Sequence, residues 1–109
     1  MPWVALCPSA SVAPGEARPI DRGDDALVVW RTAEGVPCVM DARCPHQWSH
    51  LAYEGVVDGD ELVCTAHFWR FDRAGRGTKL AFTGRRDEKS DVRVYGVRED
   101  GGQVWADVP

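Results

Sequence analysis

The sequence predicts a single all-β domain, an antiparallel sandwich or barrel of short strands. Runs rich in valine, tryptophan and other β-favouring residues recur at close spacing, and turns containing glycine and aspartate separate them. No segment keeps a helical period, and only residues 48–54 are compatible with a short turn of helix. Because a chain of 109 residues can bury one modest core, we expect one domain over residues 1–109.

Turn signals between the apolar runs indicate how the strands follow one another. An Ala-Glu-Gly turn at residues 33–35 and an Asp-Gly turn at residues 58–59 each join two runs into a predicted hairpin. The last two runs are joined across residues 100–102. The expected strands are residues 3–7, 26–31, 36–40, 56–57, 61–64, 68–72, 91–97 and 103–108.

The charges indicate which partners the protein does not bind. The net charge is −4, with 13 basic and 17 acidic residues, and this acidity argues against nucleic acid. Basic side chains concentrate in residues 70–99, which suits either electrostatic steering towards a protein partner or a plain solvated surface. No stretch approaches the ~20 apolar residues of a membrane span, and the N-terminus resembles no secretory signal. We therefore expect a cytoplasmic protein that does not bind membranes.

Two cysteine–histidine pairs are the chemically distinctive feature of the chain. Cys44-Pro45-His46 is followed by 17 residues and then by Cys64-Thr65-Ala66-His67. In a cytoplasmic chain such cysteines favour metal over disulfides. Common zinc modules pair cysteine with cysteine on one loop, so mixed pairs argue against a single zinc ion. They fit a cluster of two irons, in which two thiolates bind one iron and two imidazoles the other. A metal-free site of core cysteines and surface histidines is a further alternative.

The residues around these pairs resemble the Rieske ferredoxin family. The similarity covers Cys44–Gln47, Leu51–Gly55 and Cys64–Asp72, and the strand pattern is compatible over nearly the whole chain. It implies the Rieske fold, an antiparallel sandwich with a small cluster-binding subdomain of two loops at about residues 41–72.

The resemblance also implies one 2Fe–2S cluster and its ligands. By this match Cys44 and Cys64 hold one iron, and His46 and His67 hold the other. The family's ligands are therefore carried over as cofactor-binding and metal-binding residues, and no catalytic residue is expected.

The match further indicates a low-potential, oxygenase-associated member. High-potential members carry a cysteine in each loop that forms a bracing disulfide, and the corresponding positions here are Ser49 and Ala66. Those members also place a small hydroxyl residue where this chain has Trp69. Ring-hydroxylating dioxygenase ferredoxins usually have glycine directly after the second histidine. Phe68 at that position makes the chain more similar to ferredoxins of toluene-type diiron monooxygenases.

An electron carrier fits these residues better than an enzyme does. The chain has only three histidines, so His50 is left over and cannot form a two-histidine, one-carboxylate iron site. No glycine-rich nucleotide motif is present. We expect a monomeric ferredoxin that passes single electrons from a flavin-dependent reductase to a terminal oxygenase acting on aromatic hydrocarbons. The alternatives are a small subunit of a nitrite-reductase-like enzyme and a zinc-stapled interaction module.

Several residues near the motif have two plausible roles. His50 is either a solvated loop residue or an aid to partner recognition. Cys7 and Cys38 lie in apolar strands, which predicts buried thiols that behave as small hydrophobes. Three aromatic residues flank the ligands and either shield the cluster or pack the loops: Trp48, Phe68 and Trp69.

Overall fold

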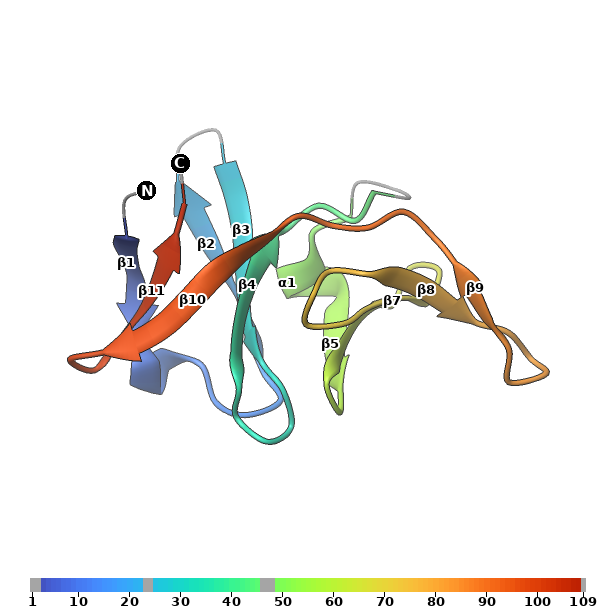
Figure 1. The fold of residues 1–109 in the computed structure, drawn as a ribbon, viewed down its shortest axis with the longest axis horizontal. Helices are drawn as coiled ribbons and strands as arrows, with labels where there is room; N and C mark the ends of the chain where they lie inside the picture. The colour runs from blue at the N-terminus through green and yellow to red at the C-terminus, as the bar shows by residue number, and fades with distance from the viewer. Residues whose placement is uncertain (1–2, 23–24, 46–48, 109) are drawn as a thin grey trace.

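The computed structural model describes residues 3–22, 25–45 and 49–108, and it confirms the all-β prediction. Two curled antiparallel sheets lie side by side (Figure 1). The six-stranded sheet has the order β1-β11-β10-β4-β3-β2. Its strands are β1 (Trp3–Pro8), β2 (Ala17–Arg22), β3 (Asp25–Arg31), β4 (Pro37–Asp41), β10 (Val94–Asp100) and β11 (Gln103–Asp107).

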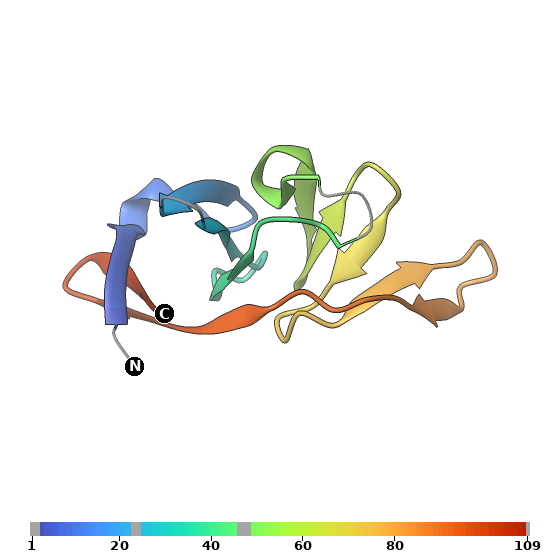
Figure 2. The same cartoon turned by 90° about the horizontal axis from the view of Figure 1, so that it is seen from above.

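The five-stranded sheet has the order β5-β6-β7-β8-β9, and its β8–β9 hairpin extends away from the other sheet (Figure 2). Its strands are β5 (Gly55–Asp58), β6 (Glu61–Cys64), β7 (Trp69–Phe71), β8 (Gly77–Leu80) and β9 (Arg86–Glu88). The two helical segments are the 3-10 turn η1 (Ser9–Ser11) and α1 (Leu51–Glu54). None of the helices in the described part of the chain is long and apolar enough to span a bilayer.

The predicted hairpins form where the turn residues indicate. β3 pairs with β4, and β5 pairs with β6 through Asp58 and Glu61. Gly59 in this second turn has φ +64°, a conformation that glycine adopts without steric cost. The short helical turn expected within residues 48–54 is α1, although Trp48 lies outside the described residues.

Three strands were not expected from the sequence: β2, β8 and β9. β2 and β9 are edge strands, and an edge strand needs neither apolar alternation nor an amide donor at every position. This explains why β2 includes Pro19, and why β9 consists of charged residues only. The single domain over residues 1–109, with a cluster-binding portion at about 41–72, stays a prediction.

Strand β3 is buried on both of its faces. Val28 and Trp30 are 0% exposed and belong to the core between the two sheets. Leu27 and Val29 point the other way, into a second core that β11 and the C-terminal residues complete. The continuous apolar run of this strand therefore reflects burial on two sides.

A buried arginine, Arg31, ties together segments far apart in the sequence. It is 7% exposed and donates hydrogen bonds to the carbonyls of Ser9 (3.0 Å), Val12 (2.7 Å) and Gly35 (3.0 Å). Its guanidinium also binds both carboxylate oxygens of Glu99, at 2.8 and 2.9 Å. These hydrogen bonds lower the pKa of Glu99 to about 2. Sequence reasoning missed this anchor, because no local pattern distinguishes Arg31 from a surface residue.

Candidate iron–sulfur cluster site

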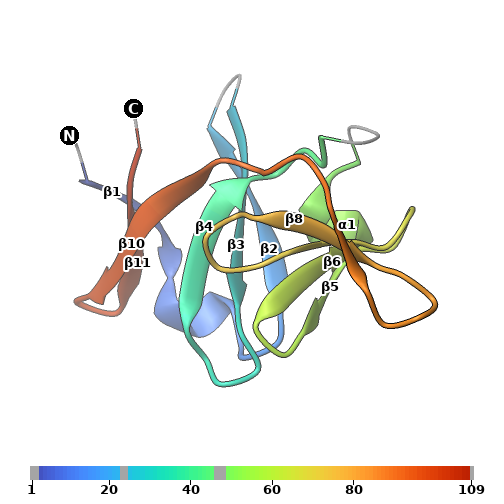
Figure 3. The ribbon, with the colours of Figure 1, turned by 45° about the vertical axis from the view of Figure 1, so that its right-hand side comes forward.

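The described parts of the β4–α1 and β6–β7 connections, which carry predicted ligands, lie towards the same side of the molecule (Figure 3). Loop 1 comprises residues 42–50, between β4 and α1, and loop 2 comprises residues 65–68, between β6 and β7. Cys44 lies in loop 1, Cys64 ends β6, and His67 lies in loop 2. His46, the fourth predicted ligand, lies outside the described residues.

The two cysteines are buried, and the described histidine ligand is exposed. Cys44 and Cys64 are 1% and 2% exposed and belong to the same core between the sheets. Neither forms a disulfide. His67 is exposed on loop 2. A Rieske cluster takes two thiolates on one iron and two imidazoles on the other, and two buried thiols with an exposed imidazole fit three of those four donors.

Within the described residues, which leave out His46, no three histidine, cysteine, aspartate or glutamate side chains form a group that could hold a single metal ion.

Loop 1 is closed by backbone hydrogen bonds across its base. The Cys44 amide donates to the carbonyl of Ser49 (2.8 Å), and an antiparallel bridge joins Arg43 to His50. Because these contacts hold both ends of loop 1, the position of Cys44 depends on the backbone of residues 49 and 50.

His50 caps α1, so the expectation of a solvated loop residue is wrong. Its Nδ1 accepts a hydrogen bond from the Ala52 amide (3.1 Å), and its ring lies 4.7 Å from that of Tyr53. Burial, followed by the positive charge of Arg43, lowers the pKa of His50. The neutral imidazole can accept at Nδ1, which the protonated form cannot. The sequence signal was present, because a polar residue precedes the only candidate helical turn.

Loop 2 contains a strained residue next to the exposed ligand. Phe68 has φ +62°, and it is the only non-glycine residue with positive φ in the described ranges. Its amide donates to the Cys64 carbonyl (2.7 Å), which closes a tight turn around His67. The left-handed conformation costs a non-glycine residue about 1–2 kcal/mol. The substitution noted in the sequence, phenylalanine for the usual glycine, therefore falls at a position where glycine is unstrained.

The two described aromatic residues beside the ligands differ in environment. Phe68 is 62% exposed, whereas Trp69 is half-buried and packs against the core that contains both cysteines. Lys89 Nζ lies 5.7 Å from the centroid of the Trp69 ring. Trp69 therefore has the predicted packing role, and Phe68 presents its ring to solvent. Trp48 lies outside the described residues.

The two remaining cysteines are not equivalent. Cys38 is 5% exposed and joins the core between the sheets, as predicted. Burial raises the pKa of its thiol to about 11, which keeps it protonated near neutral pH. Cys7 is only half-buried, because β1 lies at the edge of its sheet. Cys7 still packs against the second core, so the prediction of a buried small hydrophobe holds for Cys38 and only in part for Cys7.

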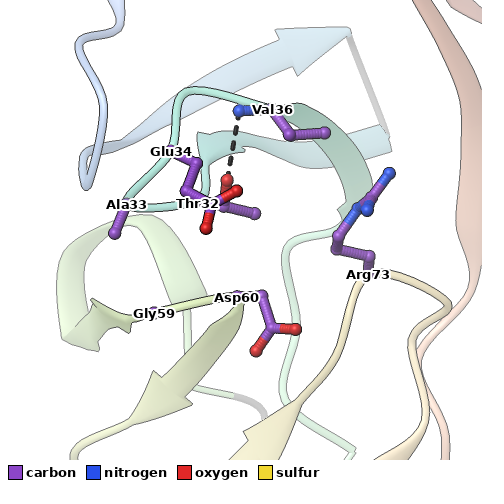
Figure 4. Close-up of a pocket in the computed structure, with 7 residues that line it drawn as sticks. All are labelled: Thr32, Ala33, Glu34, Val36, Gly59, Asp60 and Arg73. Atoms are coloured by element: carbon purple, nitrogen blue, oxygen red, sulfur yellow. Dashed lines mark hydrogen bonds between the residues drawn. The ribbon is translucent and has the colours of Figure 1, made fainter.

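A pocket of about 310 Å³ lies between the β3–β4 turn and the β5–β6 turn (Figure 4). The Ala33 amide donates to the Gly59 carbonyl (2.8 Å) and joins the two turns. Inside the first turn the Val36 amide donates to Thr32 Oγ1 (3.1 Å), the dashed line in Figure 4. None of the three predicted ligands within the described ranges (Cys44, Cys64 and His67) lines this pocket. Its residues are Thr32, Ala33, Glu34, Val36, Gly59, Asp60 and Arg73.

Comparison with known proteins places this geometry in a family. The sequence profile of the Rieske [2Fe-2S] domain matches residues 2–96. The chain is 35% identical over 95 residues to the oxygenase subunit of 5,5'-dehydrodivanillate O-demethylase from Sphingobium sp., covering 82% of this chain and 22% of that protein. It spans about a fifth to under a third of the length of the curated relatives it matches.

Two solved ferredoxins match it over nearly their whole length. The Sphingomonas yanoikuyae B1 ferredoxin has a TM-score of 0.81 and 29% identity, covering 99% of this chain and 100% of that one. The ferredoxin of carbazole 1,9a-dioxygenase from Nocardioides aromaticivorans IC177 has a TM-score of 0.79 and 26% identity, covering 97% of each chain. The chain therefore belongs to the Rieske [2Fe-2S] domain family, and this membership implies one Rieske-type 2Fe–2S cluster.

Proposed function

We propose that this protein is a ferredoxin that carries single electrons to a terminal oxygenase. Cys44 and Cys64 would hold the inner iron of the cluster, and His46 and His67 the outer one. The bound cluster supplies reversible one-electron chemistry. The protein would exclude water from the iron held by the cysteines and would present the iron held by the histidines to a partner.

The contrast in burial between thiols and imidazole is the observation that carries this proposal. Cys44 and Cys64 are both at most 2% exposed, in a core that also contains Leu51 and Phe71. His67 is exposed in loop 2. A cluster held by these residues would face a docked acceptor on the His67 side, where the side chain is exposed. The buried side, in contrast, is enclosed by both sheets.

The residues outside the proposed ligand set support a carrier rather than an enzyme. An oxygen-activating mononuclear iron site uses two histidines and a carboxylate. His50 is the only histidine beyond the proposed ligands, and its Nδ1 already accepts the Ala52 amide. The match to two ferredoxins over at least 97% of their chains also supports a carrier.

The proposed partners are a terminal oxygenase and a flavin-dependent reductase. A related structure, at 24% identity and a TM-score of 0.76, comes from a complex of reduced oxygenase and oxidised ferredoxin in carbazole 1,9a-dioxygenase. By analogy the oxygenase served by this chain would act on aromatic compounds. We also propose a cytoplasmic monomer of low reduction potential that binds neither membranes nor nucleic acid. That the chain serves a toluene-type diiron monooxygenase, or is instead a small subunit of a nitrite-reductase-like enzyme, stays a prediction.

A second candidate function follows from the curated relatives. Several are oxygenases, among them the oxygenase subunit of 3-chlorobenzoate-3,4-dioxygenase from Comamonas testosteroni, which is 38% identical over 84 residues. The chain covers 19% of that protein. A Rieske domain that passes electrons to a catalytic iron within one larger protein would have the same fold and the same proposed ligands.

The decisive experiment is anaerobic purification followed by metal analysis and electron paramagnetic resonance after dithionite reduction. We expect two irons, two acid-labile sulfides and a Rieske-type signal, which Cys44→Ser and His67→Cys each abolish. A colourless protein with one zinc would overturn the proposal in favour of an interaction module, and a normal Rieske signal in either variant would overturn the ligand assignment.

A further inference from the structure

The two loops leave different strands, yet a two-iron cluster requires them to stay at a constant separation. At the positions matching the bracing disulfide of high-potential relatives this chain has Ser49 and Ala66, and none of its four cysteines is in a disulfide. Another contact must therefore connect the loops, and α1 lies between them along the chain.

The N-terminal end of α1 is attached to loop 1. The Leu51 amide donates to the Ala42 carbonyl (2.7 Å), and Leu51 is 0% exposed in the core that contains Cys44 and Cys64. This end of α1 therefore moves with the segment that precedes Cys44.

At its C-terminal end α1 continues into β5, where Gly55 pairs with Cys64, and Thr65 adds a side-chain contact from loop 2. Thr65 directly follows Cys64, and both its amide (2.8 Å) and its Oγ1 hydroxyl (2.7 Å) donate to the Glu54 carbonyl. A carbonyl at the end of a helix lacks an intrahelical donor, so Thr65 supplies the partner that Glu54 would otherwise take from water. Any residue except proline could donate the amide hydrogen bond, whereas the hydroxyl hydrogen bond requires serine or threonine at position 65.

We propose that Thr65 is a positioning residue for the cluster: its hydroxyl fastens loop 2 to α1, and through α1 to loop 1, in place of the absent disulfide. This inference rests on the proposed ligands. It predicts that loss of the hydroxyl loosens loop 2 without removing any ligand. Looser loops admit water, which stabilises the more negative reduced cluster and raises the reduction potential.

The test compares three variants of the anaerobically purified holo-protein with the wild type. Thr65→Val removes the hydroxyl and keeps the branched shape, whereas Thr65→Ser keeps the hydroxyl. Thr78→Val is the matched control, because Thr78 lies in β8 of the sheet from which loop 2 emerges and its hydroxyl accepts one hydrogen bond from Arg86 (3.1 Å). The measurements are the rate at which an iron chelator bleaches the visible absorption, and the reduction potential.

We expect Thr65→Val to lose its cluster about fivefold faster than the wild type, the change given by one hydrogen bond of about 1 kcal/mol. Its potential shifts to a more positive value. Thr65→Ser and Thr78→Val keep the wild-type rate and potential. The inference is overturned if Thr65→Val matches the wild type, if serine fails to rescue, or if Thr78→Val accelerates cluster loss equally. A wild-type protein without a two-iron cluster overturns the proposed function instead, before any variant is compared.

Discussion

Replacing Gly55 by alanine should disrupt the junction between α1 and the five-stranded sheet. Gly55 directly follows α1 and pairs with Cys64. A Cβ at this position would lie 2.1 Å from the Leu51 carbonyl oxygen and 3.2 Å from Leu62 Cδ1. Since a close carbon–oxygen contact is roughly 3.3 Å, the Leu51 carbonyl would have to move by more than 1 Å.

The expected loss of stability in Gly55→Ala depends on whether Leu51 and Leu62 can shift to make room for the new Cβ. Leu51 and Leu62 are both 0% exposed, so neither can yield into solvent. Overpacking of a close-packed core costs about 1–3 kcal/mol, and a clash with backbone belongs at the upper end of that range, about 2–3 kcal/mol. At about 4 °C per kcal/mol for a domain of this size, Gly55→Ala should lower the unfolding midpoint by about 8–12 °C.

Thermal unfolding followed by far-ultraviolet circular dichroism tests this value, with Gly96→Ala as the control. A Cβ at Gly96 would meet its nearest atoms at 3.5 Å (Trp3) and 3.6 Å (Asp107), which are ordinary contacts. We therefore expect Gly96→Ala to change stability by less than about 0.5 kcal/mol. If the two variants unfold at the same temperature, the reasoning from close approach at Gly55 is refuted.

Two further predictions concern Glu99 and Phe68. The folded-state pKa of Glu99 is depressed from 4.5 to about 2, so its ion pair with Arg31 contributes stability above pH 4.5 and loses it as the pH falls towards 2. Because the Glu99 side chain is 37% exposed, we expect the free energy of unfolding of the wild type to exceed that of Glu99→Gln by only about 1–2 kcal/mol at pH 7. This difference should disappear as the pH falls to 2, and a difference that persists at pH 2 contradicts the prediction. At φ +62° glycine is unstrained and alanine is not, so Phe68→Gly should be about 1 kcal/mol more stable than Phe68→Ala in urea unfolding, and equal midpoints contradict the strain.

The chemistry of the site could be predicted from the sequence because it resides in short segments. Cys44 and His46 are two residues apart, and Cys64 and His67 three, so each loop displays its donors in the printed sequence. The β3–β4 and β5–β6 hairpins were equally local, since a turn signal between two apolar runs specifies antiparallel pairing.

Only the tertiary structure shows how these loops are held. Arg31 forms an ion pair with Glu99, 68 positions away in the sequence. The hydrogen bond from Thr65 to Glu54 spans 11 positions, and no sequence pattern predicts it. His50 acts as a cap because α1 begins beside it. Such contacts form when separate elements pack together, and their energies depend on burial and geometry that a linear sequence does not display. The sequence by itself therefore indicated the proposed ligands and determined the strand class, whereas only the tertiary structure shows the contacts by which α1 joins the two loops.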